Sequence, residues 1–310
     1  MAFLGALPAR FRRQRILIVG CGDVGLRSAR LLGGGPAGTG ASGRVRLLAL
    51  SSTPERRDAL RAAGLTPLAG NLDDGRSLRR LAGLATRVLH LAPPPGAGED
   101  DPRSLALTRA LSRGRRPRAL VYGSTSGVYG DCGGVWVSET RPLNPATPRA
   151  RRRSAAEAVL RWWGLASGVP VSLLRIPGIY APDREGGTPR ERLLRGTPVL
   201  RREEDVHTNH IHADDLARAC ARALWRAPSQ RVFNCCDDTE LAMGDYFDLA
   251  ADLYGLPRPE RITWAQARER LSPLTLSFMG ESRRLRNTRI KRELGLVLRH
   301  PTVEQGLRAG

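Results

Sequence analysis

ILIVGCGDVG, residues 16–25, joins a short apolar strand to a glycine-rich turn and the start of a helix. A G-x-G-x-x-G turn in that setting is typical of a dinucleotide-binding βαβ unit. Gly20 permits the tight turn, Gly22 lets the backbone approach a pyrophosphate, and Gly25 allows helix and strand to pack closely. The amides at the helix N-terminus, around Asp23 and Val24, would hold the pyrophosphate. The turn therefore predicts binding of NAD(H) or NADP(H).

Short apolar runs alternate with helical patterns along the rest of the chain. The expected strands are 45–50, 66–69, 88–92, 119–122, 171–175 and 232–235, and the expected helices are 55–63, 77–84, 105–111, 149–163 and 214–225. This alternation is typical of βαβ units around a buried parallel sheet. We therefore expect an α/β fold, a Rossmann-type doubly wound parallel sheet with a small interleaved C-terminal substrate lobe.

The regular alternation is lost after residue 175, where prolines, turns and isolated helices follow. We expect a dinucleotide-binding Rossmann domain at 15–182, to which residues 213–236 return. Residues 183–212 and 237–310 are expected to form a smaller, substrate-binding lobe. Residues 1–14 predict a flexible N-terminal arm, and the Gly-rich stretch 33–43 predicts a flexible loop.

The end of the second strand indicates which dinucleotide is bound. An acidic residue there would hydrogen-bond the ribose of NAD and repel a 2′-phosphate. This chain has Ser51 and Ser52 instead, followed by Arg56 and Arg57. Hydroxyl and guanidinium groups suit a phosphate dianion, which favours NADP over NAD. The alternative is that both arginines lie on a solvated helix start.

The composition raises the question of nucleic-acid binding, because the formal net charge is +20. The charge is almost all arginine, scattered along the chain, and Lys291 is the only lysine. We therefore expect no nucleic-acid partner. No apolar run is long enough for a membrane span, so no membrane partner is expected. Five cysteines without a C-x-x-C motif suggest reduced thiols, of which Cys235 and Cys236 are expected to be buried, and the chain is expected to be cytoplasmic.

Six further segments carry recognisable motifs in unbroken order: GNLDD (70–74), HLA (90–92), STSGVYG (124–130), RIPGIYAP (175–182), NHIHADDLA (209–217) and LG with a later proline (294–301). Together with the glycine turn they resemble the extended short-chain dehydrogenase/reductases, the NAD-dependent epimerase/dehydratase family, and especially its atypical members. The resemblance spans about residues 15–307. It implies a Rossmann domain with a small substrate lobe, acting on a carbonyl or carbinol, often of a nucleotide-sugar.

The resemblance also implies which loops hold the cofactor. Asn71 and Leu72 occupy the loop that holds adenine in the family, with Asn71 where an aspartate is usual. Leu91 and Ala92 match the fourth-strand end beside the cofactor. The other contacts expected from the family lie near the nicotinamide, at Pro177 and Ile179.

The catalytic helix departs from the family pattern. The family uses a Tyr-x-x-x-Lys pair, but K-x-x-x-E spacing places Arg149 at the tyrosine and Arg153 at the lysine position. Arginine stays protonated at any cellular pH and cannot replace a phenol in proton transfer. Thr125 would orient the substrate oxygen. Tyr129 is a further candidate for the missing acid.

Asp131 and Glu139 are the remaining candidates for that acid, and a structural role is the alternative for each of them and for Tyr129. The histidines at 207, 210 and 212 lack the geometry of a metal cluster, so no metal is expected.

Two functions remain open at this point. One is an NAD(P)-dependent oxidoreductase or epimerase-like enzyme acting on a small molecule. The other is a non-catalytic NAD(P)H-binding sensor or scaffold. The arginines of the helix would bind an anion, or would lie on a solvated face if the register is off by a turn. Extended members of the family often pair through this helix, so a homodimer through Arg149–Trp163 is also expected.

Overall fold

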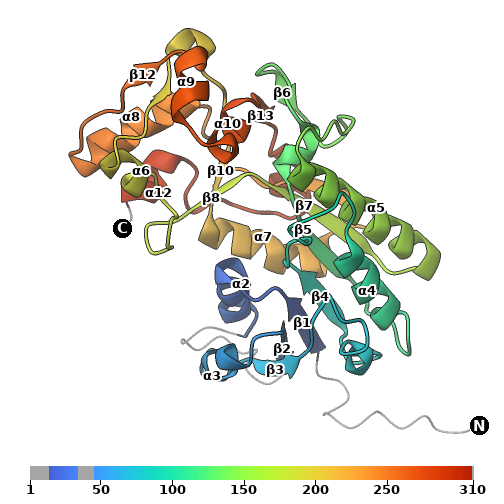
Figure 1. The fold of residues 1–310 in the computed structure, drawn as a ribbon. Helices are drawn as coiled ribbons and strands as arrows, with labels where there is room; N and C mark the ends of the chain where they lie inside the picture. Colours follow the sequence, from blue (N-terminus) through green and yellow to red (C-terminus); the bar gives the residue numbers. More distant parts are fainter. Residues whose placement is uncertain (1–13, 34–44, 309–310) are drawn as a thin grey trace, which may run out of the picture.

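A seven-stranded parallel sheet is the centre of the computed structural model, which describes residues 14–33 and 45–308. Its order is β11-β7-β5-β4-β1-β2-β3 (Figure 1). The strands are β1 (Gln14–Val19), β2 (Val45–Ser51), β3 (Thr66–Ala69), β4 (Arg87–His90), β5 (Leu120–Thr125), β7 (Val171–Ile176) and β11 (Arg231–Asn234). The order reverses between β1 and β4, and such a switch point is where open α/β sheets bind ligands.

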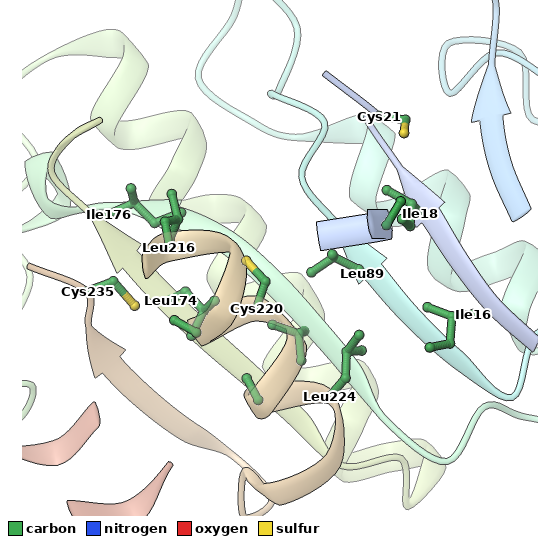
Figure 2. Packing of buried hydrophobic residues seen from close by; sticks show 14 of the residues in the cluster. Ile16, Ile18, Cys21, Leu89, Leu174, Ile176, Leu216, Cys220, Leu224 and Cys235 are labelled. Carbon is green, nitrogen blue, oxygen red and sulfur yellow. The ribbon is translucent and has the colours of Figure 1, made fainter. Parts of the chain in front are cut away.

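Helices cover both faces of the sheet, as a doubly wound fold requires. One face carries α2 (Asp23–Gly33), α3 (Arg57–Ala62), α7 (Ala213–Arg226) and α11 (Thr288–Glu293), and the other carries α4 (Pro102–Leu111) and α5 (Pro148–Ser167). Figure 2 shows Leu216, Cys220 and Leu224 of α7 against the sheet. Full burial of one such leucine contributes about 1.5–3 kcal/mol. The predicted fold class is confirmed.

A second group of elements lies beyond one end of the sheet (Figure 1). Its strands are β6 (Trp136–Val137), β8 (Gly178–Tyr180), β9 (Val199–Leu200), β10 (His210–His212), β12 (Arg261–Ile262) and β13 (Arg284–Leu285), paired as β10–β8, β12–β9 and β13–β6. Its helices are α6 (Arg190–Leu194), α8 (Met243–Tyr254), α9 (Trp264–Arg270), α10 (Pro273–Met279) and α12 (Val303–Arg308). A separate apolar cluster, which includes Val199, Phe247 and Ile262, forms its core. Short 3-10 turns complete the chain: η1 (Pro54–Arg56), η2 (Arg79–Leu81), η3 (Ser126–Tyr129) and η4 (Arg202–Glu204).

The helix predicted at 77–84 is wrong, because only the turn η2 forms there. Ser77 uses its hydroxyl group to hydrogen-bond the carbonyl oxygens of Asn71 and Asp74, at 3.0 and 2.7 Å. Such local bonds from serine compete with helix formation. Gly83, with a φ of +66°, then ends the segment.

All five cysteines are buried and free. Within residues 14–33 and 45–308, no helix is long and apolar enough to cross a membrane. Residues 1–13 and the loop residues 34–43 lie outside the described part of the chain, so the two predictions of flexibility stay predictions.

Candidate functional site

The glycine turn after β1 has the geometry that its sequence predicted. Gly20 has a φ of +86°, and a Cβ there would lie 2.3 Å from the nitrogen of Ala92. A Cβ on Gly25 would lie 3.1 Å from the Gly20 carbonyl oxygen. Gly22 differs, because a Cβ there meets nothing within 4 Å. The turn therefore leaves open space over Gly22, at a helix N-terminus, where the pyrophosphate of a dinucleotide fits.

Buried Arg27 fixes the surroundings of the turn. Its guanidinium group contacts the carboxylates of Asp23 at 3.0 Å, Asp183 at 2.6 Å and Asp214 at 2.6 Å. Only 6% of the Arg27 side chain is exposed. Burial alone would lower the pKa of Arg27, but its hydrogen bonds to the three aspartates raise it overall. The group therefore ties α2 to the start of α7 and to the loop after β8.

A cavity of about 640 Å³ lies between the carboxyl ends of the strands and the second group of elements. Seven predicted site residues line it: Val24, Leu91, Thr125, Arg149, Arg153, Pro177 and Ile179. These residues come from segments that follow or end β1, β4, β5 and β7, together with α5. Because the strands are parallel, their carboxyl ends meet at one edge of the sheet. The volume is in the range of small-molecule sites.

A second cavity, of about 320 Å³, lies where β2 and β3 end. Ser51, Ser52 and Asn71 line it, as do two arginines, Arg57 and Arg80. The predicted phosphate contact Arg56 is not among the lining residues.

Arg56 instead donates a hydrogen bond of 2.7 Å to the carbonyl oxygen of Cys21, inside the glycine turn. Leu72 packs against the apolar core. Ala92 is buried against Gly20, and its amide donates to Val19.

Helix α5 presents both of its predicted arginines to the large cavity. Thr147 caps the helix by accepting a hydrogen bond from the amide of Ala150, and this fixes where the helix begins. Arg153 donates to the carbonyl oxygen of Gly123 at 2.7 Å and to the hydroxyl of Tyr122 at 3.0 Å. Both arginines thus lie in the wall that Thr125 shares, and Arg149 is also exposed to solvent.

Arg149 lies with its guanidinium carbon 4.5 Å from the centre of the Phe278 ring, which comes from α10. Burial lowers the pKa of Arg149. The group still remains a cation, because an arginine pKa starts above 12. Arg149 therefore offers a permanent positive charge in the cavity wall.

One turn further along α5, Glu157 joins a buried polar network behind the cavity. Its carboxylate accepts hydrogen bonds from Arg175 at 2.8 and 3.1 Å and from the hydroxyl of Ser124 at 2.6 Å. Arg175 also donates to the hydroxyl of Tyr129, which in turn donates to Asn234 at 2.7 Å. Burial opposes the charge on Arg175, yet its hydrogen bonds to Glu157 raise its pKa overall. The network holds β5, β7 and α5 together below the cavity.

The three candidates for the missing acid all lie outside the cavity wall. Tyr129 has its hydroxyl engaged in the buried network, and burial raises its pKa to about 12. Asp131 accepts hydrogen bonds from the amides of Gly133 and Ser282. Glu139 accepts one from the amide of Asn234. Each carboxylate thus stabilises a local loop.

Other groups that exchange protons do line the cavity. His207 and Glu281 are half-buried in its wall. His210 lines it too, but burial lowers the pKa of its imidazole to about 4. Thr125 accepts a hydrogen bond of 3.2 Å from the amide of Gly127, and its hydroxyl proton remains available for a ligand oxygen.

The histidines at 207, 210 and 212 do not gather around one point. In the described residues, one group brings metal-ligating atoms within 4.8 Å of one another: His212, Asp214 and His300. Asp214 already pairs with Arg27 at 2.6 Å. A neighbouring guanidinium repels a metal ion, and the absence of a metal site stays a prediction.

A model of the NAD dependent epimerase/dehydratase family matches residues 40–236 of this chain. The chain belongs to this family. The match includes the motifs on β5, α5, β7 and α7 that line the cavity or support it.

Solved structures of similar proteins have the same fold as this chain. A conserved protein of unknown function from Silicibacter pomeroyi is 30% identical, with a TM-score of 0.75 over 96% of this chain and 97% of that one. A dTDP-glucose 4,6-dehydratase from Streptomyces venezuelae, solved with NAD bound, is 21% identical, with a TM-score of 0.74 over 96% of this chain and 95% of that one.

By sequence, a dTDP-L-rhamnose 4-epimerase from Burkholderia thailandensis is 28% identical over 40% of this chain and 37% of its own length. The matched part spans less than half the length of the curated relatives.

The sequence did not predict several residues that line the two cavities. Arg80 lies in the segment that was predicted to be a helix, and no motif marks it. Arg192 lines the large cavity but is one arginine among many in the sequence. The aromatic side chains of the far wall, Tyr246, Phe247 and Phe278, carry no local signal, because only the tertiary fold brings them to the cavity.

Proposed function

We propose that this chain binds NADP(H) or NAD(H) across the two cavities and transfers hydride to or from a carbonyl or carbinol carbon of a small molecule. One observation carries the proposal: the open glycine turn lies between a cavity lined by Ser51 and Ser52 and a cavity lined by Thr125. A bound dinucleotide occupies three adjacent sites in this order, one for its adenosine half, one for its pyrophosphate and one for its nicotinamide.

Residues of the chain have separate roles in this proposal. The α2 amides bind the pyrophosphate, and Val24, Leu91, Pro177 and Ile179 exclude water around the nicotinamide. When bound, the cofactor supplies or accepts the hydride. Thr125 orients the substrate oxygen.

Arg149 and Arg153 stabilise negative charge on the substrate, as preorganised cations do in water-poor sites. His207, in the same wall, supplies a group able to exchange the accompanying proton. Residues 183–212 and 237–310 supply the far wall, where the rest of the substrate lies. The relatives named as epimerases and dehydratases carry nucleotide sugars in their names, which makes a nucleotide-sugar or a related metabolite a candidate substrate.

Label transfer tests this function against the alternative of a non-catalytic sensor or scaffold. The purified protein is incubated with a metabolite extract and with NADPH or NADH deuterated at C4. An enzyme transfers deuterium to a metabolite above the level without protein, and Thr125→Val and His207→Gln lower the transfer. A protein that binds the dinucleotide and labels no metabolite is a sensor or scaffold.

The second cavity leads to a prediction on the cofactor. We propose that Arg57 and Arg80, together with the two serines, bind the 2′-phosphate, and that NADPH therefore binds more tightly than NADH. Arg80→Ala should weaken NADPH binding about tenfold, since a charge-assisted hydrogen bond contributes about 1.5–3 kcal/mol. NADH binding should not change. Fluorescence titration measures both.

Arg76→Ala is the matched control, because Arg76 is exposed in the same segment and does not line the cavity. Arg56 donates a hydrogen bond to the glycine turn, so Arg56→Ala should weaken binding of both dinucleotides alike. An NADH preference, or an equal loss of both dinucleotides in Arg80→Ala, would contradict the assignment.

We also propose a homodimer through α5 and α4. Trp162 and Leu165 on α5 are 69% and 72% exposed, and Leu105 on α4 is 36% exposed. Apolar side chains of that size gathered on two neighbouring helices favour a protein interface. Sedimentation should show a dimer that Leu165→Asp converts to a monomer. A monomeric unmodified protein at micromolar concentration would rule the interface out.

A further inference from the structure

Two guanidinium groups enter the large cavity without an anionic partner. Among the described residues, no carboxylate or carbonyl oxygen accepts a hydrogen bond from the side chain of Arg149 or Arg192. Both arginines line the cavity, and they come from helices α5 and α6, which are well separated in Figure 1. The other arginines of the wall are engaged: Arg153 with Gly123, and Arg283 with Glu281 at 2.8 Å.

Each of these two guanidinium groups lies over a phenyl ring. Arg149 lies 4.5 Å from the ring centre of Phe278, and Arg192 lies 4.4 Å from that of Phe247. Stacking on a ring holds a guanidinium plane in place and leaves its N–H edge available. The same arrangement therefore occurs twice in one cavity, with side chains from four different helices.

Burial makes the missing hydrogen-bond partner costly for Arg192. The Nη2 atom of Arg192 is buried and has no hydrogen-bond partner. Arg192 is half-buried, and burial lowers the pKa of its guanidinium group. Arg149 is exposed as a residue, so the case for its anion rests on its place in the cavity wall and on its missing acceptor. A buried charge without a partner is unfavourable, and a bound anion offsets that cost. Glu281 is the only carboxylate among the described lining residues, and Arg283 holds its Oε2 atom at 2.8 Å. Its charge raises the pKa of Arg149 and so partly offsets the lowering by burial, but it forms no ion pair with that guanidinium group.

We infer that the substrate carries two anionic groups, one bound by Arg149 beside the reacting carbon and the other bound by Arg192 at the far wall. Each group is a carboxylate or a phosphate, because both accept the paired N–H groups of a guanidinium. This inference rests on the proposed function in one respect: the proposed function places the reacting carbon next to Thr125. A neutral sugar linked to a nucleoside diphosphate carries its charge away from the reacting carbon and leaves Arg149 unpaired.

Calorimetric titration of the full chain tests the inference without a known substrate. The probes are the dicarboxylates malonate, succinate, glutarate and adipate, the phosphonocarboxylates phosphonoacetate and 3-phosphonopropionate, the monoanion butyrate, and UDP-glucose. At least one dianion should bind about tenfold more tightly than butyrate, which corresponds to about 1.4 kcal/mol. Affinity should peak at one chain length, set by the separation of the two arginines. Whether a dicarboxylate or a phosphonocarboxylate binds best identifies the second group.

Variants locate the binding. Arg149→Gln and Arg192→Gln should each reduce dianion affinity about tenfold, to the level of butyrate. Arg195→Gln is the matched control and should change nothing, because Arg195 is exposed at the end of the same helix α6 and does not line the cavity. NADPH binding by Arg192→Gln should equal that of the unmodified protein, which shows that the variant folds.

Three outcomes would overturn the inference: dianions that bind no better than butyrate, dianion binding that survives both substitutions, and tight binding of UDP-glucose that Arg149→Gln leaves unchanged. The proposed function fails by a different result, the absence of dinucleotide binding and of label transfer. Dianion affinity is measured on the protein without dinucleotide, so the two failures are distinguishable.

Discussion

Gly22→Val is expected to weaken dinucleotide binding at least about a hundredfold, which corresponds to about 2.7 kcal/mol, while the fold stays intact. The physical reason is the open space over this residue. A Cβ on Gly22 meets nothing within 4 Å in the protein, so the valine side chain would fill the space in which the pyrophosphate approaches the backbone. Titration with NADPH, followed by nicotinamide fluorescence, measures the loss, and circular dichroism reports the fold.

Two other glycines serve as controls for this experiment. Gly75 is exposed and also has no atom within 4 Å of an added Cβ, but it lines neither cavity. Gly75→Val should therefore bind NADPH normally. Gly20→Val should fail to fold properly, since its Cβ would lie 2.3 Å from the backbone of Ala92. A folded Gly22→Val protein that binds NADPH with full affinity would show that the pyrophosphate does not lie on this turn.

Glu157→Ala is expected to lower the free energy of unfolding by about 3–5 kcal/mol, the usual cost of breaking a buried ion pair. The substitution leaves the guanidinium of Arg175 buried and without its carboxylate, with 3% of each side chain exposed in the intact pair. It also removes the acceptor for the hydroxyl of Ser124. Urea denaturation measures the change.

An exposed pair gives the comparison. Arg258 and Asp252 form a 2.7 Å pair whose side chains are 60% and 51% exposed, and Asp252→Ala should lower the free energy of unfolding far less than Glu157→Ala. If Glu157→Ala were as mild as Asp252→Ala, the network below the cavity would not hold the strands and α5 together. Glu157→Gln should fall between the two, because an amide keeps an acceptor for Ser124 but loses the charge.

The sequence predicted the sheet well because its strands are buried on both faces. The run 16–19 is apolar throughout and the run 171–175 is buried at every position, and the glycine turn fixes where the first helix begins. The segment 77–84 was predicted incorrectly for a local reason. Its apolar spacing suits a helix, but hydrogen bonds from the Ser77 side chain stabilise a turn instead.

The site was predictable where local spacing determines it. Arg149, Arg153 and Glu157 are four residues apart, so one helical face presents all three to the strand ends. The contacts of Arg56 and Arg80 were not predictable, because they depend on where a loop returns in space. The position of Arg192 in the cavity was not predictable for the same reason. In a chain with a net charge of +20, only the tertiary structure distinguishes an arginine in a cavity from one in solvent.

The central claim is that this chain binds a nicotinamide dinucleotide in the turn and cavities described above. Calorimetric titration of the purified protein, first freed of any bound nucleotide, tests it most directly. We expect saturable binding of NADPH at one site per chain, with weaker binding of NADH. The absence of binding by either dinucleotide at millimolar concentration, in a protein shown to be folded, would contradict it.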